Sequence, residues 1–108
     1  MANNYILMVL TEPVEGKEAE FNDYYENTHL DEVLETTHLT SAQRFRLVDQ
    51  VGGKCPVPYL ALYETEADDP RAVIENLNAT RKDRLQSDAL NSRTANVWVF
   101  EPIGPRHE

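Results

Sequence analysis

Four stretches of the chain have the pattern of β-strands: the first and the last are apolar runs rich in aliphatic or aromatic residues, and the two middle ones alternate between apolar and polar residues. The predicted strands lie at residues 5–11, 39–49, 59–66 and 96–100. Pro13 and Pro102 end the first and the last of them, because proline cannot donate a ladder hydrogen bond. Gly52 and Gly53 lie between the two middle strands, so we expect those strands to form a hairpin.

Two stretches between the strands have the three-and-four spacing of an amphipathic helix. The first begins after Gly16, and its spacing runs through Phe21, Tyr24, Tyr25 and Thr28. A short second helical piece follows with Val33 and Leu34. The other helix has a strong start signal, because Asp69 can cap it and Pro70 fits its first position. The order β-α-β-β-α-β predicts an α+β domain with a ferredoxin-like antiparallel sheet.

The strand residues divide by parity into two sets, because successive side chains on a strand point to opposite faces of the sheet. One set is wholly apolar, which suits the face covered by the helices: Ile6, Met8, Leu10, Phe45, Leu47, Leu60, Leu62, Val97 and Val99. The other set is aromatic with a few polar groups: Tyr5, Leu7, Val9, Ala42, Arg44, Arg46, Tyr59, Ala61, Tyr63, Asn96, Trp98 and Phe100. Two helices cover only one face, so we expect a second copy of the chain to cover this ring-rich face. The paired sheets would then enclose a small-molecule cavity.

Composition narrows the partners that we expect. The chain has 108 residues, which suits a single domain over residues 1–108. Its 10 basic and 19 acidic residues give a net charge of −9, so neither nucleic acid nor an anionic membrane is an expected partner. No stretch approaches the ~20 apolar residues of a membrane span, and we expect no signal peptide. Cys55 is the only cysteine, which suits a cytoplasmic protein.

The run "EFNDYYENTHLDEVLETTHLTSAQRFRL", with an aromatic strand and a terminal "VWVF" after it, resembles the dimeric α+β barrel superfamily, closest to its EthD-like members. The most specific part of the resemblance is Tyr25-x-x-x-His29-Leu30. The chain departs from the family pattern at two places. Asp31 replaces a residue that is commonly proline in that family, and Thr37-His38 replaces a Pro-Gly pair. The resemblance implies a homodimeric barrel whose chemistry ranges over cofactor-free monooxygenases, lactone isomerases, polyketide cyclases, hydroxynitrile lyases and haem-degrading enzymes.

His29 is the first catalytic candidate. Its imidazole, with an ordinary pKa of about 6.5, can carry a proton in either direction at neutral pH. From the residues alone, the alternative is a C-terminal cap of the first helix, and the resemblance favours a place in the cavity. Side chains that could bind a metal occur at His29, Asp31, Glu32 and His38. No pair of these residues has the spacing of a helical H-E-x-x-H motif. We therefore expect no metal and no organic cofactor.

The ring-rich face supplies the other candidates. We expect Arg44 with Tyr59 to stabilise an anion, with Arg46 as the alternative arginine. Tyr25 lies four residues before His29 and is a better neighbour for it than the adjacent tyrosine, which should face another surface. Further substrate contacts are expected from Tyr5, Tyr63, Asn96, Trp98 and Phe100. The basic residues before the last strand are expected on a solvated surface: Arg81, Lys82, Arg84 and Arg93.

These candidates together predict a homodimeric enzyme that transfers a proton next to a carbonyl of a small aromatic or polyketide-like molecule. It would act as an isomerase, a cyclase or a lyase. Within enzymes, the alternative is a cofactor-free monooxygenase, which oxygen consumption during turnover would reveal. A non-catalytic small-molecule binding protein is the other class. Such a protein would still bind its ligand after loss of His29, and it would form no product.

Overall fold

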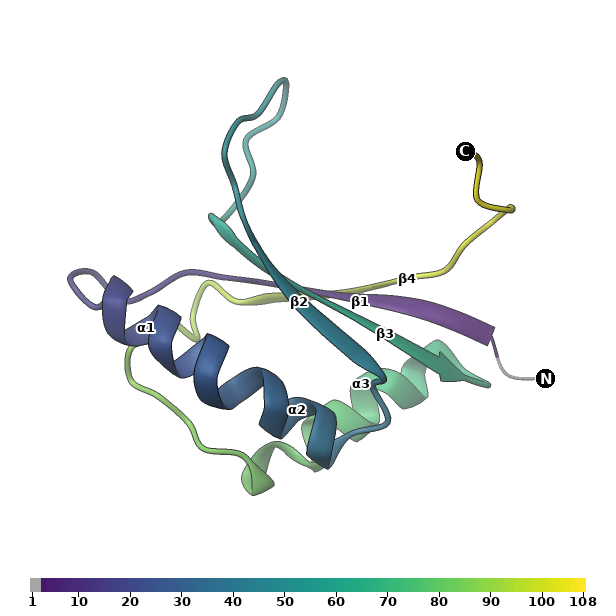
Figure 1. Ribbon diagram of the computed structural model, residues 1–108, viewed down its shortest axis with the longest axis horizontal. Helices are drawn as coiled ribbons and strands as arrows, with labels where there is room; N and C mark the ends of the chain where they lie inside the picture. The colour runs from purple at the N-terminus through teal and green to yellow at the C-terminus, as the bar shows by residue number, and fades with distance from the viewer. Residues whose placement is uncertain (1–2) are drawn as a thin grey trace.

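The computed structural model describes residues 3–108 as a four-stranded antiparallel sheet with helices on one side (Figure 1). The strands are β1 (Asn3–Thr11), β2 (Ser41–Arg46), β3 (Tyr59–Ala67) and β4 (Asn96–Phe100). Their order in the sheet is β2-β3-β1-β4, so β1 lies between β3 and β4. All four predicted strands and the α+β class are confirmed, and the strand order is compatible with a ferredoxin-like fold.

Helical residues run without a break from Glu18 to Thr36. They comprise α1 (Glu18–Tyr24), a π-helical turn η1 (Tyr25–His29) and α2 (Leu30–Thr36). The alternative in which His29 caps the end of the first helix is wrong: no glycine or proline interrupts residues 17–36, and the helical run continues past His29. His29 is therefore an interior residue of the helical run and not a C-terminal cap.

The second predicted helix is α3 (Pro70–Ala79), and its start is confirmed. The Asp69 side chain accepts a hydrogen bond from the backbone N–H of Arg71 at 2.9 Å. A short 3₁₀ turn, η2 (Arg81–Asp83), follows, and an irregular segment leads to β4. None of the helices within residues 3–108 combines the length and the apolar character needed to span a membrane.

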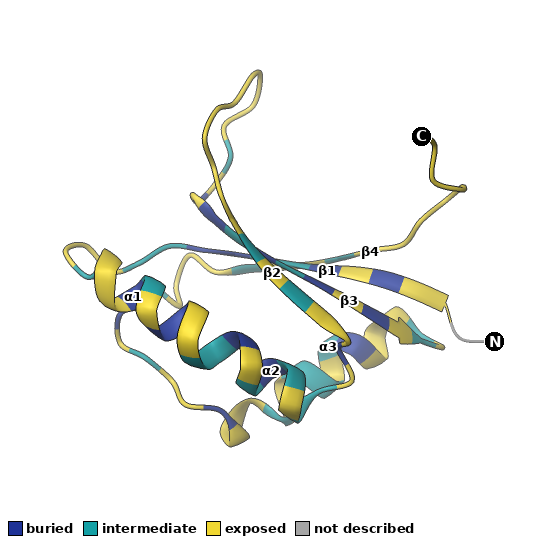
Figure 2. Ribbon diagram, in the orientation of Figure 1, coloured by how far each residue is buried: buried dark blue, intermediate teal, exposed yellow. Residues whose placement is uncertain are grey.

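The helices cover the ring-rich face of the sheet, so the predicted assignment of the two faces is wrong. Tyr5, Leu7, Tyr59 and Tyr63 belong to the buried core together with residues of the helices. Figure 2 shows buried stretches in β1 and β3 and in the helices. The members of the aliphatic set that precede β4 lie on the opposite, open face, where Phe45 is 44% exposed. Alternation groups the residues of one strand, but it does not say which group meets the helices when both groups are apolar.

The grouping predicted for β4 is wrong as well. Val97 and Val99 lie opposite Val9 and Leu7 of β1 and share the helix side of the sheet with them. Trp98 and Phe100 lie opposite Met8 and Ile6, on the open face. Trp98 and Phe100 therefore do not share a face with the buried tyrosines, because the register of β4 against β1 sets its faces.

The open face of the sheet carries several large apolar side chains, with polar residues such as Gln43 and Glu64 between them. Its large exposed residues are Ile6, Phe45, Leu47, Trp98 and Phe100. The hairpin arm, residues 47–58 between β2 and β3, projects on this side of the sheet, away from the helices, and so does the C-terminal tail (Figure 1). Val48 and Val51 of the arm are almost fully exposed. The chain thus has a bare sheet face rich in apolar side chains, with two projections beside it.

Candidate functional site

A cavity of about 210 Å³ lies between the helices and the sheet. Its polar lining includes Tyr24 from α1, Tyr25 and His29 from η1, Tyr63 from β3 and Arg84 after η2. Its apolar lining includes Val9, Val33, Leu77 and Val97. Apolar walls with a few convergent polar groups are the usual composition of a small-molecule site.

The π-helical turn brings His29 against two tyrosines. In an α-helix, residues three and four apart are neighbours, whereas the i→i+5 bonding of a π turn also brings together residues five apart. The His29 ring stacks on the Tyr24 ring at a centroid distance of 5.2 Å and meets the Tyr25 ring edge-on at 4.8 Å. The expectation that Tyr24 and Tyr25 face different surfaces is therefore wrong, and both are buried.

A chain of hydrogen bonds assigns the tautomer of His29. Nδ1 of His29 lies 3.0 Å from Oη of Tyr24, which lies 2.7 Å from the carbonyl oxygen of Leu85. A carbonyl oxygen only accepts, so the single phenolic proton of Tyr24 is donated to Leu85. Nδ1 of His29 therefore carries a proton and donates it to Tyr24, and Nε2 keeps its lone pair. Nε2 makes no hydrogen bond to any of residues 3–108.

Burial shifts the pKa values of the groups around the cavity. It lowers the pKa of His29 to about 4, and the positive charge of Arg84 acts in the same direction. Burial raises the pKa of Tyr24 to about 12, and it raises the pKa values of Tyr25 and Tyr63 as well. At neutral pH the imidazole is therefore uncharged, and the three phenols keep their protons.

The Tyr25 hydroxyl is buried and has no hydrogen-bond partner within the described residues. Thr11 and Tyr63 act on the pKa of Tyr25 as hydrogen-bond partners would, but neither meets both the distance and the angle of a hydrogen bond to its hydroxyl. A buried hydroxyl without a partner costs roughly 1–3 kcal/mol. Native structures therefore contain few such groups. Each one is explained by a bound ligand, by a water molecule or by a function of the group.

Arg84 also lines the cavity, although the sequence predicted it on a solvated surface; that prediction is wrong. The residue is only 7% exposed. Its Nη1 donates to the hydroxyls of Thr36 (3.0 Å) and Thr80 (2.8 Å), and its Nη2 donates to the carbonyl oxygen of Leu77 (2.9 Å). Its Nε–H is buried and meets no acceptor among residues 3–108. Arg84 follows η2 in an irregular segment, where no periodicity separates inward from outward residues.

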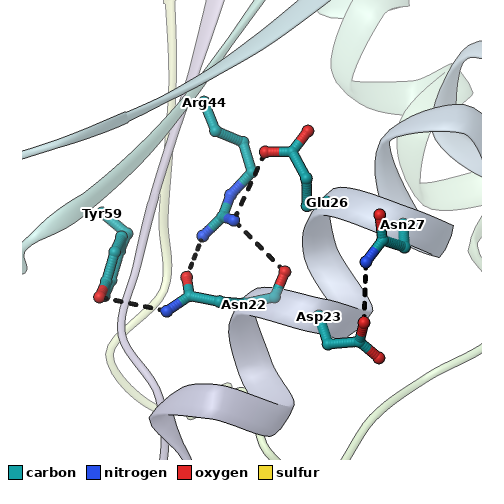
Figure 3. A network of polar contacts seen from close by, with 6 residues as sticks. All are labelled: Asn22, Asp23, Glu26, Asn27, Arg44 and Tyr59. Atoms are coloured by element: carbon teal, nitrogen blue, oxygen red, sulfur yellow. Dashed lines mark hydrogen bonds and ion pairs between the residues drawn. The ribbon is translucent and has the colours of Figure 1, made fainter.

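Arg44 and Tyr59 lie together, but outside this cavity (Figure 3). Nη2 of Arg44 donates to Oδ1 of Asn22 at 2.7 Å, and Nδ2 of Asn22 donates to Oη of Tyr59 at 3.3 Å. Glu26 lies 3.8 Å from Nη1 of Arg44. The guanidinium packs on the rings of Phe21, Tyr25 and Tyr59. Arg44 therefore reaches the wall of the cavity only through the Tyr25 ring.

The other predicted site residues are spread over the molecule. Arg46 lines the shallow groove of Arg44 and Tyr59 at the β2 edge. Tyr5 and Phe100 border a second groove at another part of the sheet, and Trp98 lies on the open face. Asn96 donates to the carbonyl oxygen of Thr94. Of the predicted site residues, the cavity brings together Tyr25, His29 and Tyr63.

No family model, curated protein or solved structure matches this chain. The resemblance to the dimeric α+β barrel superfamily therefore stays a prediction. Among residues 3–108, no group of three or more histidine, cysteine or acidic side chains is placed to hold a metal ion. The candidate site is thus defined by its own geometry: an uncharged imidazole with a free Nε2, protonated phenols and a buried arginine.

Proposed function

We propose that this chain is a cofactor-independent enzyme that moves a proton at the carbon atom next to the carbonyl group of a small molecule. The observation that carries the proposal is the hydrogen-bond chain from His29 through Tyr24 to the carbonyl oxygen of Leu85. It holds a neutral imidazole with an unprotonated Nε2 in the wall of the cavity. A general base needs such a nitrogen within reach of the proton that it removes.

The proposed reaction begins when Nε2 of His29 takes a proton from the carbon next to the carbonyl. The C–H bond breaks, an N–H bond forms, and the electron pair moves onto the carbonyl oxygen as an enolate. The protonated Tyr25 hydroxyl, which has no acceptor of its own within residues 3–108, donates to that oxygen, and Tyr63 lies beside it. Return of the proton to a different carbon gives an isomerase, attack of the enolate on a second carbonyl gives a cyclase, and loss of a leaving group gives a lyase.

The volume of the cavity limits the size of the substrate. About 210 Å³ is less than the ~300–1,000 Å³ of sites for drug-sized ligands. We therefore propose a substrate with one aromatic ring or a chain of similar size. A longer, polyketide-like chain would have to extend out of the cavity mouth.

We also propose that the fold is ferredoxin-like and that it pairs with a second copy as a dimeric α+β barrel of the EthD-like type. The support is the open face, where Ile6, Phe45 and Trp98 are 38–44% exposed in the single chain. Exposed large apolar residues gathered on one face of a sheet favour an interaction site. The cavity lies within one chain and not between two sheets, as the sequence predicted, so the second copy would cover the open face without completing the cavity.

Proton exchange in D₂O tests the proposed function. Wild-type protein is incubated with a panel of enolisable one-ring carbonyl compounds, phenylpyruvate and acetophenone among them. Mass spectrometry follows deuterium at the carbon next to the carbonyl, and an oxygen electrode reports any monooxygenase activity. We expect His29→Gln to lower the exchange rate by roughly 10²–10⁴-fold, the usual contribution of a general base.

His38→Gln is the matched control, because His38 lies after α2 and does not line the cavity, so its loss should leave the exchange rate unchanged. Exchange that is equally fast in His29→Gln overturns the proposal. So does a protein that exchanges no member of the panel above the buffer rate. Binding of these compounds without exchange would identify a non-catalytic binding protein instead.

A further inference from the structure

We infer that the cavity selects substrates that carry a carboxylate, which binds the buried guanidinium of Arg84. The inference rests on the proposed function, since it names the class of molecule that the same cavity takes. Selection for an anion is nevertheless a binding property and can be measured without turnover. Three features support it: a buried cation without a counter-ion, unpaired donors on one cavity, and a cavity with room for one small anion.

Arg84 is a buried cation without a counter-ion. None of the 19 acidic residues forms an ion pair with it, although all of them lie within residues 3–108. Its three hydrogen bonds go to neutral acceptors, which are the side chains of Thr36 and Thr80 and the carbonyl oxygen of Leu77. Neutral acceptors satisfy N–H groups but leave the positive charge unbalanced, and a buried unbalanced charge is strongly unfavourable.

A purely structural role accounts for only part of this arrangement. The bond to Leu77 lies at the C-terminal end of α3, where basic side chains commonly cap a helix. A cap of α3 explains the bonds to Leu77 and Thr80, but neither the bond to Thr36 of α2 nor the other two of the five guanidinium N–H groups. The Nε–H of Arg84 and the hydroxyl of Tyr25 are both buried without a partner in the described chain, and both residues line the cavity. An oxyanion bound at this wall of the cavity would supply the acceptor that the guanidinium of Arg84 lacks.

The cavity suits a carboxylate better than a more highly charged anion. Arg84 is the only buried cation in its lining within residues 3–108, because His29 is uncharged and Arg81 is exposed. One guanidinium balances one negative charge, whereas a phosphate monoester carries about −1.5 to −2 at pH 7. The planar fork of a guanidinium also matches the planar carboxylate group. The expected ligand is therefore a small monoanionic acid.

A carboxylate at Arg84 would also make His29 a stronger base. The charge of Arg84 is one of the two causes that hold the pKa of His29 low. A bound negative charge would cancel part of this effect, and the pKa of His29 would rise. Nε2 would then accept a proton more readily when substrate is present. Substrate binding and basicity are thus coupled in the direction that favours turnover.

The test compares benzoate with its neutral counterpart benzamide, using titration calorimetry at pH 7. Both molecules carry one ring, and they differ in the charge at the carboxyl position. We expect the wild-type protein to bind benzoate about tenfold or more tightly than benzamide, because charge-assisted hydrogen bonds are about twice as strong as neutral ones. Arg84→Gln should remove the preference, and Arg84→Lys should keep part of it.

Arg93→Gln is the matched control, because it removes the same charge from an exposed residue that does not line the cavity and should change the preference by no more than about twofold. A preference that persists in folded Arg84→Gln overturns the inference. If that variant does not fold, the wild-type comparison decides: equal binding of benzoate and benzamide, as in a cavity that holds only water, overturns it.

The two proposals fail separately. His29→Gln should still prefer benzoate, so a benzoate preference without any proton exchange rejects the proposed function and keeps the carboxylate site. Exchange that depends on His29 in a protein without a benzoate preference keeps the enzyme and rejects the role of Arg84.

Discussion

At the scale of single residues, the proposed chemistry depends on how Tyr24 orients His29. Tyr24 donates its only proton to Leu85, so its oxygen is left to accept from Nδ1 of His29. Tyr24 thus acts as a positioning residue, whereas the Tyr25 hydroxyl is a donor still without an acceptor in the described chain. In the free protein, the Tyr24 hydroxyl therefore has two hydrogen-bond partners, whereas the hydroxyl of the adjacent Tyr25 has none in the described chain.

Removal of the Tyr25 hydroxyl should separate stability from activity. Because the hydroxyl is buried without a partner, Tyr25→Phe should leave the free energy of unfolding unchanged or raise it by about 1 kcal/mol. If the hydroxyl donates to the enolate oxygen, the same change should lower the exchange rate by about 10²-fold. Urea unfolding and the exchange assay measure the two effects. Tyr24→Phe is the contrast, because it removes a hydroxyl with two partners and should lower stability.

His29 should make the protein less stable in mild acid. Its pKa is about 4 in the folded protein and about 6.5 in the unfolded chain, so between these values only the unfolded chain binds the proton. Stability therefore falls as the pH decreases from about 6.5 to about 4, and His29 contributes about 3 kcal/mol of this fall. Urea unfolding at pH 7 and pH 4.5 measures it against His29→Gln, which should lack this contribution. Equal pH dependence in the two proteins would refute the low pKa.

Sequence reasoning found those site residues whose chemistry is visible in the side chain and its spacing. His29 and Tyr25 stood out as an imidazole and a ring four residues apart, and both line the cavity. Arg84 could not be found in this way, because its environment is made by residues of α2 and α3 that meet it only in the fold. Arg44 was predicted to be surrounded by rings, and it is, but in a different groove.

At the scale of the element, the π-helical turn explains how one helical run buries both of its halves. Phe21 and Leu30 are both buried, although nine positions separate them. Nine residues make about two and a half turns of an α-helix, which would place the two side chains on opposite sides. The wider π turn between them corrects the phase. The apolar pattern does shift its phase near residue 29, and this shift was the available signal for the turn.

The loop that leads into this helical run should be sensitive to its glycine. Gly16 has a φ of 82°, a conformation that L-residues disfavour by roughly 1–2 kcal/mol. We expect Gly16→Ala to lower the free energy of unfolding by about 1 kcal/mol, since an added Cβ meets no other atom and only the backbone is strained. Gly53→Ala, at a glycine with ordinary φ, is the control. Thermal unfolding compares them, and equal stability of both variants would contradict the strain.

Local signals were enough to predict the strands and helices, but not how they pack. The Asp69-Pro70 start, the paired glycines of the hairpin and the apolar or alternating pattern of each strand all act within a few residues. Which sheet face meets the helices is decided by packing between distant elements, and here both faces are apolar. The tyrosines of the strands lie on the helix side, where Phe21 and Tyr25 pack against Tyr59 and Tyr63.

At the scale of the whole molecule, the open face of the sheet exposes large apolar side chains to water, and burial of these side chains by a partner would be favourable. The sequence indicated that two helices leave one apolar face bare, and this holds although the identity of that face is reversed. We propose the same face of a second copy as the cover. The hairpin arm projects on this side and carries exposed Val48 and Val51, which would extend the contact beyond the sheet (Figure 1).

A charge in the middle of the open face should separate the two copies. Met8 lies between Leu62 of β3 and Trp98 of β4, so Met8→Glu would bury a carboxylate in the proposed interface. We expect the wild-type protein to sediment as a dimer and the variant to dissociate about 10²-fold or more readily. Trp98 is the only tryptophan, so its emission should shift to longer wavelength on dissociation.

Val14→Glu is the matched control for this change. It puts the same charge on an exposed apolar residue that belongs to none of the strands, and it should leave the dimer intact. The proposed pairing would be contradicted if the wild-type protein sedimented as a single chain at micromolar concentration and the fluorescence of Trp98 had the long emission wavelength of a solvent-exposed indole.

The protonation state of His29 tests the central claim most directly, and nitrogen-15 NMR of the histidine rings measures it. The His29 signals are assigned by their absence from His29→Gln. We expect a proton on Nδ1 and none on Nε2 at pH 7, and a single titration with a pKa of about 4 that rises when benzoate is added. A His29 that carries its proton on Nε2, or that titrates near the ordinary value of about 6.5 without ligand, would contradict the account.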